Sequence, residues 1–138
     1  MKSFARTLVA AVDKYQYDLK DFIEKAVTTN IFADYLDDYT MYIQEGTYIA
    51  ARISEELKRR GETICKASEL QSQTPLATNE TAYWIGYLML YWRYMEQVTP
   101  TSFLKYNFEE IIWAFDVLHT QSVEYAIEII KEEYQVSS

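Results

Sequence analysis

The stretch from Glu80 to Val98, ETAYWIGYLMLYWRYMEQV, constrains the fold most, because apolar and aromatic side chains surround nearly the whole helical wheel drawn for it. A helix on the surface of a domain needs a polar face, so a helix of this composition belongs in the interior. We therefore predict a central aromatic helix over residues 79–98, with shorter helices packed around it. Its broad apolar face is formed by Trp84, Leu88, Tyr91, Trp92 and Met95, and is extended by Tyr83, Tyr87, Leu90 and Tyr94.

A narrow polar arc remains on this helix and holds Gly86, Arg93, Glu96 and Gln97, with Met89 at its edge. Gly86 has no side chain, so the backbone of a neighbouring element can approach the helix closely there. Arg93 lies two turns further along the same arc, where a buried or interfacial pair is expected. A structural pairing within the domain is the simpler interpretation of Arg93, and a contact with a partner is the functional one.

The same stretch is long enough to cross a bilayer, but it contains Glu80, Arg93 and Glu96 together with many tyrosine hydroxyls, all of which are costly in hydrocarbon. We therefore expect a core helix of a soluble bundle and no membrane contact. A second interpretation assigns part of the aromatic surface to a docking groove for a partner.

The length of 138 residues suits one domain, so residues 1–138 are expected to form a single helical domain. The single cysteine, Cys65, permits no internal disulfide and fits a reducing compartment. We expect it to be a small buried side chain near a helix end. Asp13 and Lys14 interrupt the short apolar run near the start, which argues against a secretory signal. These features predict a cytoplasmic protein.

Three-four spacing of apolar residues predicts the other helices, and no stretch sustains the alternation that is typical of a strand. The spacing from Phe4 to Ala26 fits one long helix or two, and Asp18, with an acid three residues later, favours a second helix that starts there. Asn107, with a glutamate three residues on, forms a capping box for a helix that reaches about Leu118. The fold class is therefore all-α, with about six or seven helices. In addition to the helices already named, we expect helices at residues 31–38, 47–60 and 120–134.

The inward-facing positions of these helices follow from the same spacing. Gly61 is a typical stop for the helix at residues 47–60, and residues 62–79 read as a surface connection with one helical turn near Lys66. The expected inward positions are Ile31, Phe32, Tyr35 and Leu36; Ile49, Ala50, Ile53 and Leu57; Phe108, Ile111, Ile112, Phe115 and Leu118; and Tyr125, Ala126, Ile129 and Ile130.

The charge is unevenly distributed along the chain. The net charge is −8, residues 21–45 carry six acids against one base, and residues 116–133 carry five against one. Residues 52–66 instead hold five bases against three acids, so residues 43–61 have some character of a helix-turn-helix. Because an excess of acid repels nucleic acid and anionic membranes, we expect no direct nucleic-acid binding and favour a basic protein partner.

Candidate catalytic residues are few. His119 is the one histidine and lies at an expected helix end, so a capping role is favoured over catalysis, and zinc or di-iron binding would need more histidines. Carboxylates one turn apart could hold Mg²⁺, as in Asp21 with Glu24, although solvated helix faces show the same spacing. We assign no catalytic, cofactor-binding or metal-binding residue and expect no enzyme activity.

The candidate partner-binding residues are mainly acidic. The glutamates of the last expected helix recur every four residues and form either a solvated face or a contact surface for a basic partner. A group of aspartates near residue 36 offers a second acidic surface, or alternatively a Mg²⁺ site. The candidate set is Arg93, Glu124, Glu128, Glu132, Asp34, Asp37 and Asp38.

The motif AYWIGYLMLYWRY at residues 82–94, followed by Ser102-Phe103 and VLHT at residues 117–120, resembles a group of small acidic bacterial proteins. Their hallmark is a Tyr-Trp-x-Gly-aromatic helix, and the likeness covers about two thirds of the chain. The resemblance implies an all-helical antitoxin-like protein encoded beside a toxin gene, with a toxin of the ADP-ribosyltransferase-like kind. Glu45 and Tyr48 stand where the family tends to have glycine, and no catalytic residue is carried over.

Three functions follow as expectations. The first is a non-catalytic protein-binding module that neutralises a cognate toxin, as an antitoxin does, and it is compatible with a homodimer. The second is an acidic DNA mimic or phage-type inhibitor of a nucleic-acid enzyme, which needs two rows of acids spaced like phosphates. The third is a small Mg²⁺-dependent all-α nucleotide hydrolase.

Overall fold

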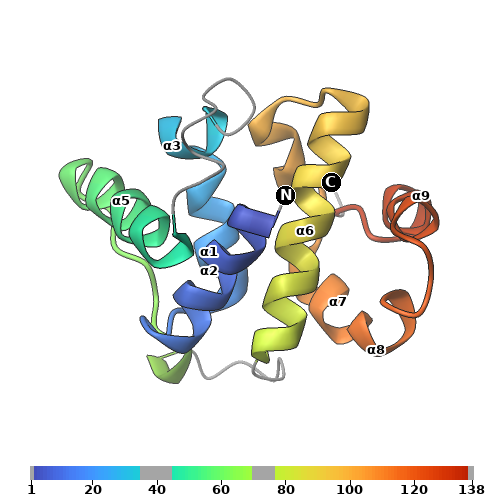
Figure 1. Ribbon diagram of the computed structural model, residues 1–138, viewed down its shortest axis with the longest axis horizontal. Coiled ribbons are helices and arrows are strands. Elements are labelled where there is room, and N and C mark those ends of the chain that lie inside the picture. Colours follow the sequence, from blue (N-terminus) through green and yellow to red (C-terminus); the bar gives the residue numbers. More distant parts are fainter. Residues whose placement is uncertain (1, 35–44, 70–76, 137–138) are drawn as a thin grey trace.

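The computed structural model describes residues 2–34, 45–69 and 77–136 (Figure 1). All regular structure in these three ranges is helical, as the fold-class prediction required, and antiparallel pairing is limited there to isolated bridges. The elements are α1 (Lys2–Asp13), α2 (Leu19–Ala26), α3 (Asn30–Ala33), α5 (Gly46–Arg59), the 3₁₀ helix η1 (Ala67–Glu69), α6 (Asn79–Glu96), the 3₁₀ helix η2 (Pro100–Lys105), α7 (Phe108–Trp113), α8 (Phe115–Leu118) and α9 (Val123–Glu133).

The central helix α6 runs through the middle of the molecule, with α1 beside it, α5 at one end of the long axis and α9 at the other (Figure 1). Buried side chains from α1, α2, α3, α5, α6, α7 and α9 join in one hydrophobic core. Among the described helices, none combines the length and the apolarity that a bilayer crossing needs. The predicted core position of the aromatic helix is therefore confirmed.

The orientation of α6 differs from the prediction. Gly86 and Met89 of the expected polar arc are buried, and Gly86 lies against α1, whereas Met95 and Tyr94 on the expected apolar face are 57% and 60% exposed. A Cβ atom at Gly86 would lie only 2.6 Å from the Cα of Ala5, so the two helix backbones are in contact there. A helical wheel ranks positions only by polarity. Two helices that cross closely need small residues at the crossing point, which places Gly86 inside. A tyrosine at the side of the buried face can still extend its hydroxyl group to water.

The first predicted helical run is two helices, as Asp18 indicated. Its carboxylate accepts a hydrogen bond from the backbone N–H of Asp21 at 2.9 Å and caps α2. Gln16, with φ of +56°, lies in the link between α1 and α2. The backbone N–H of Asp18 also donates to the carbonyl of Cys65 at 2.8 Å, which ties the link to the segment before η1.

Helix α5 begins and ends close to the predicted bounds. Its four predicted inward residues are fully buried, and Gly61, with φ of +79°, follows its end. Thr29 caps α3 by accepting from the N–H of Phe32, and both predicted inward residues of α3 are buried. Tyr35 and Leu36, which were also expected to face inward, lie outside the described residues.

The C-terminal part contains two departures from the prediction. The helix expected from Asn107 to about Leu118 is interrupted at Ala114 and forms α7 and α8, so eight α-helices occur in the described ranges instead of six or seven. Its five predicted inward residues are nevertheless buried. In α9, which is capped at Ser122, Tyr125 is 56% exposed, whereas Ala126, Ile127 and Ile130 are buried in the core.

Candidate partner-binding surface

The predicted glutamates of α9 are exposed at the right-hand end of the molecule in Figure 1. Glu124 accepts a hydrogen bond from the phenol of Tyr91 on α6. This bond favours the ionised carboxylate and the neutral phenol, so it lowers the pKa of Glu124 and raises the pKa of Tyr91. The tyrosine thus fixes one carboxylate of the row against the central helix.

A second contact between α6 and α9 centres on Lys131. Its ammonium group lies 3.1 Å from Glu96 and 3.3 Å from Glu128. The hydrogen bond to Glu96 is the main cause of a raised pKa of Lys131. Glu96 also accepts from the indole N–H of Trp92 at 3.2 Å. The charge of Glu128 is therefore partly neutralised by Lys131. Glu132 lies one turn later on α9 and is exposed.

Large apolar side chains are also exposed on the helices of this C-terminal part of the chain. Trp113 is 56% exposed, Val117 68% and Tyr125 56%, all within α7, α8 and α9. Exposed aromatic side chains are typical of protein interfaces. We name the surface made by Trp113, Val117, Tyr125, Glu124, Glu128 and Glu132 the C-terminal face.

A groove with a volume of about 560 Å³ lies next to this face, between the start of α6 and α8. The rings of Trp84 and Phe115 meet edge to face, with centroids 5.6 Å apart, and the ring of His119 stacks on Phe115 at 4.3 Å. We name it the aromatic groove. Its lining residues are Lys2, Glu80, Tyr83, Trp84, Tyr87, Phe115 and His119.

His119 caps the end of α8, as its position in the sequence predicted. Its Nδ1 atom lies 2.6 Å from the carbonyl oxygen of Phe115. Because a carbonyl oxygen can only accept, the hydrogen must be on Nδ1, and Nε2 is left for solvent or a ligand. The imidazole thus has a structural bond through Nδ1 and also lines the groove.

The aromatic groove and the C-terminal face are continuous. The ring of Tyr87, in the groove, stacks on Tyr91 with centroids 6.4 Å apart, and Tyr91 bonds to Glu124. The two tyrosines are one helical turn apart on α6. A ligand bound in the groove can therefore extend over Tyr91 to the carboxylates of α9.

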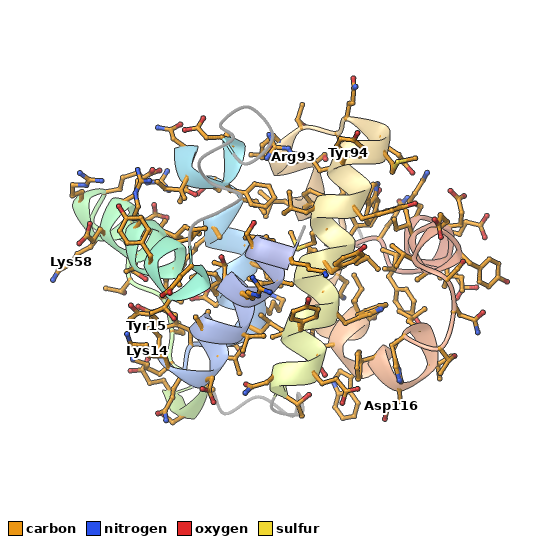
Figure 2. The ribbon with its side chains drawn as sticks, in the orientation of Figure 1. Lys14, Tyr15, Lys58, Arg93, Tyr94 and Asp116 are labelled. Atoms are coloured by element: carbon orange, nitrogen blue, oxygen red, sulfur yellow. The ribbon has the colours of Figure 1, made fainter. Side chains whose placement is uncertain are left out.

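Arg93 does not belong to this surface, although it was a candidate contact residue. It is 7% exposed, and its guanidinium donates to the carbonyls of Phe32 and Ala33 at 2.6 and 2.7 Å (Figure 2). The guanidinium carbon lies 5.1 Å from the centroid of the Phe32 ring. The structural interpretation of Arg93 is therefore the correct one, because α6 places its side chain against the end of α3.

The remaining acidic candidates are not brought to the C-terminal face. Asp34 is exposed where α3 ends, and Asp37 and Asp38 lie outside the described residues. Asp21 pairs with Lys25 at 2.9 Å and accepts from the N–H of Cys65. Across the described ranges, no three histidines, cysteines or acids gather where a metal ion could be held.

The segment that resembled a helix-turn-helix is also of mixed charge. A shallow groove of about 310 Å³ between α5 and the link before η1 is lined by both Lys58 and Glu55, among others. Arg60 lies 3.3 Å from Glu62 and donates to the hydroxyl of Thr28 at 2.9 Å. Its guanidinium is thus held within the domain instead of projecting towards a phosphate backbone.

In comparisons with known proteins, the chain matches no family model, no curated protein and no solved structure. The candidate site therefore depends on its own geometry: an aromatic groove that continues into a surface of exposed aromatic side chains and carboxylates.

Proposed function

We propose that this chain is a non-catalytic protein-binding module that neutralises a basic partner, as an antitoxin neutralises its toxin. The observation that carries the proposal is the C-terminal face, where Trp113, Val117 and Tyr125 are each more than half exposed and α9 carries a row of exposed glutamates. Residues 116–133 carry a net charge of −4, from five acids and one base.

This combination suits protein recognition for two reasons. Exposed tryptophan and tyrosine supply much of the binding free energy at interfaces, because large apolar area is removed from water there. The surrounding carboxylates attract a partner of opposite charge and align it as it approaches. A basic protein would therefore associate rapidly and bury the apolar residues on contact.

The resemblance of the motif at residues 82–94 to antitoxin-like proteins supports the same function. On that basis the partner is a cognate toxin encoded beside this chain, of the ADP-ribosyltransferase-like kind, and both act in the bacterial cytoplasm. Trp84 and Tyr87 of that motif line the aromatic groove, so the residues that carry the likeness also border the proposed contact surface.

The DNA-mimic alternative receives less support from the described acids. Asp21 pairs with Lys25, Glu24 lies 2.6 Å from Lys20, and Glu128 pairs with Lys131. A mimic of the phosphate backbone needs a row of acids without such neighbours, since each pair cancels the charge that it should display. The same ion pairs argue against a Mg²⁺-dependent hydrolase. Such an enzyme needs carboxylates that are free to bind the ion, and these are paired with lysines.

Affinity capture from the native host tests the proposal. The tagged chain is compared with a triple variant, Glu124→Gln, Glu128→Gln and Glu132→Gln, and with a control, Glu55→Gln, Glu62→Gln and Glu69→Gln, that loses the same charge elsewhere. We expect the chain and the control to retain a basic protein that stops growth when expressed alone and is harmless when co-expressed with this chain. The triple variant should lose it. If the chain emerges alone at physiological salt and its neighbouring gene is harmless, the proposal is wrong.

A further inference from the structure

The attraction between the carboxylates of α9 and a basic partner gives no role to the aromatic groove. The groove indicates a further feature of that partner. We infer that the groove receives one uncharged aromatic or leucine side chain from a helix of the partner, whose basic residues then lie against the carboxylates of α9. This inference rests on the proposed function, since it takes the partner to be a basic protein, and it adds an anchor residue and its spacing to that partner.

The lining of the groove favours an uncharged anchor. Tyr83, Trp84 and Tyr87 line one side and Phe115 the other, so most of the wall is aromatic carbon. The two charged residues at its border, Lys2 and Glu80, have opposite signs and do not select a charged side chain. A volume of about 560 Å³ accommodates a large side chain with part of its helix backbone.

The position of Glu124 sets the spacing of the basic residues. Tyr91 lies one turn beyond Tyr87 on α6 and bonds to Glu124, so a carboxylate stands about one helical turn beyond the groove. Glu128 shares Lys131 with Glu96, which lies five residues beyond Tyr91 on α6, so a second carboxylate stands about one turn further along the central helix. A partner helix with its anchor at position i therefore presents lysine or arginine near positions i+4 and i+8, which is an amphipathic helix with a basic flank.

Synthetic peptides test the inference directly. The first is a fluorescein-labelled amphipathic helical peptide with a single phenylalanine at i and lysines at i+4 and i+8. In the second, alanine replaces the phenylalanine, and in the third, glutamine replaces both lysines. We expect the first to bind about tenfold more tightly than the second by fluorescence anisotropy, because only an anchored peptide fills the groove. The third should also bind more weakly than the first, because its glutamines cannot pair with Glu124 and Glu128.

A double variant, Tyr83→Ala with His119→Ala, locates the anchor, since both residues line the groove. We expect it to reduce the advantage of the phenylalanine peptide over the alanine peptide to less than about twofold. The control is Tyr48→Ala, which removes a tyrosine that is 53% exposed on α5, at the far end of the molecule, and should leave the advantage unchanged (Figure 1). Far-UV circular dichroism and thermal melting show whether each variant is folded.

Several outcomes would overturn the inference. Equal affinity for the phenylalanine and alanine peptides would show that the groove holds no anchor, and a preserved advantage in the double variant would place the anchor elsewhere. A dimer in sedimentation that the double variant dissociates would make a second copy of this chain the occupant. If the host partner is lost by the triple glutamine variant but retained by the double groove variant, the proposed function stands and only this inference fails.

Discussion

At the scale of single residues, Gly86 determines how α1 and α6 meet. A Cβ atom there would lie 2.6 Å from the Cα of Ala5 and 2.9 Å from the carbonyl oxygen of Phe4. These are backbone atoms, so a neighbouring side chain cannot relieve the overlap by rotating. The contact is possible only because the central helix has no side chain at this position.

Gly86→Ala should therefore destabilise the protein. Alanine favours a helix over glycine by about 1 kcal/mol, but separation of two packed helices costs more, and we expect a net loss of about 1–3 kcal/mol. Urea denaturation followed by circular dichroism measures the free energy of unfolding. Gly61→Ala is the control: it has open space around it and a φ of +79°, so it should lose only about 1 kcal/mol. A Gly86→Ala protein more stable than the wild type would contradict the close contact.

The bond between Tyr91 and Glu124 predicts a pH dependence. The folded-state pKa of Glu124 is lowered from its usual 4.5, so the bond stabilises the fold above that value, and this contribution is lost as the pH falls through the lowered pKa. Tyr91→Phe should raise the pKa of Glu124 towards 4.5, as measured by NMR titration of its side-chain carboxyl group. The stability difference between the variant and wild type should shrink at acid pH.

At the scale of elements, Arg93 joins α6 to α3. Its guanidinium satisfies two carbonyls at the end of a four-residue helix that has little stability of its own. Arg93→Met should destabilise the protein by about 2–4 kcal/mol, because the buried carbonyl of Phe32 and the partly buried carbonyl of Ala33 both lose a charged donor. Arg93→Lys should restore only part of this loss, since an ammonium group lacks the two parallel donors of a guanidinium. Thermal and urea unfolding measure both, and Lys58→Met, an exposed residue of α5, should be nearly neutral (Figure 2).

Most elements could be predicted because their signals are local. Spacing of apolar residues and capping side chains such as Asp18, Asn107 and Ser122 act within a few residues along the chain, so the helix ends follow from the sequence. The break at Ala114 could not be predicted in this way, since alanine favours helix and the interruption depends on how α7 and α8 pack on the core. The outward position of Tyr125 likewise depends on tertiary contacts of α9.

The candidate site was only partly predictable for the same reason. The glutamate row of α9 is visible as a four-residue repeat, and His119 is visible as a residue at a helix end. The aromatic groove instead joins α6 to α8 through Trp84 and Phe115, which are far apart in the sequence. The aromatic stretch suggested a docking groove, but no local pattern indicates which α8 residues complete it.

At the scale of the whole molecule, two segments of opposite net charge lie at opposite ends of the long axis. Helix α5 and the following link, with a net charge of +2 over residues 52–66, lie at one end, and α9, within the segment of net charge −4, lies at the other (Figure 1). In Figure 2, Lys58 lies at the α5 end, and Asp116, on α8, lies at the lower right. Of these two segments, a basic partner is attracted to the one that contains α9 and repelled by the one that contains α5.

This separation predicts which charges control the rate of association. The triple variant Glu124→Gln, Glu128→Gln and Glu132→Gln changes the net charge from −8 to −5, because each substitution removes one negative charge. We expect it to slow association of the lysine-containing peptide by about fivefold at low salt in stopped-flow fluorescence, and high salt should reduce this difference by screening. The control triple variant at Glu55, Glu62 and Glu69 makes the same change in net charge at the opposite end. This control should slow association far less, because screening in water confines the effect of each charge to its own end of the molecule. Equal slowing in both variants would show that the net charge directs the partner, whatever the positions of the charges.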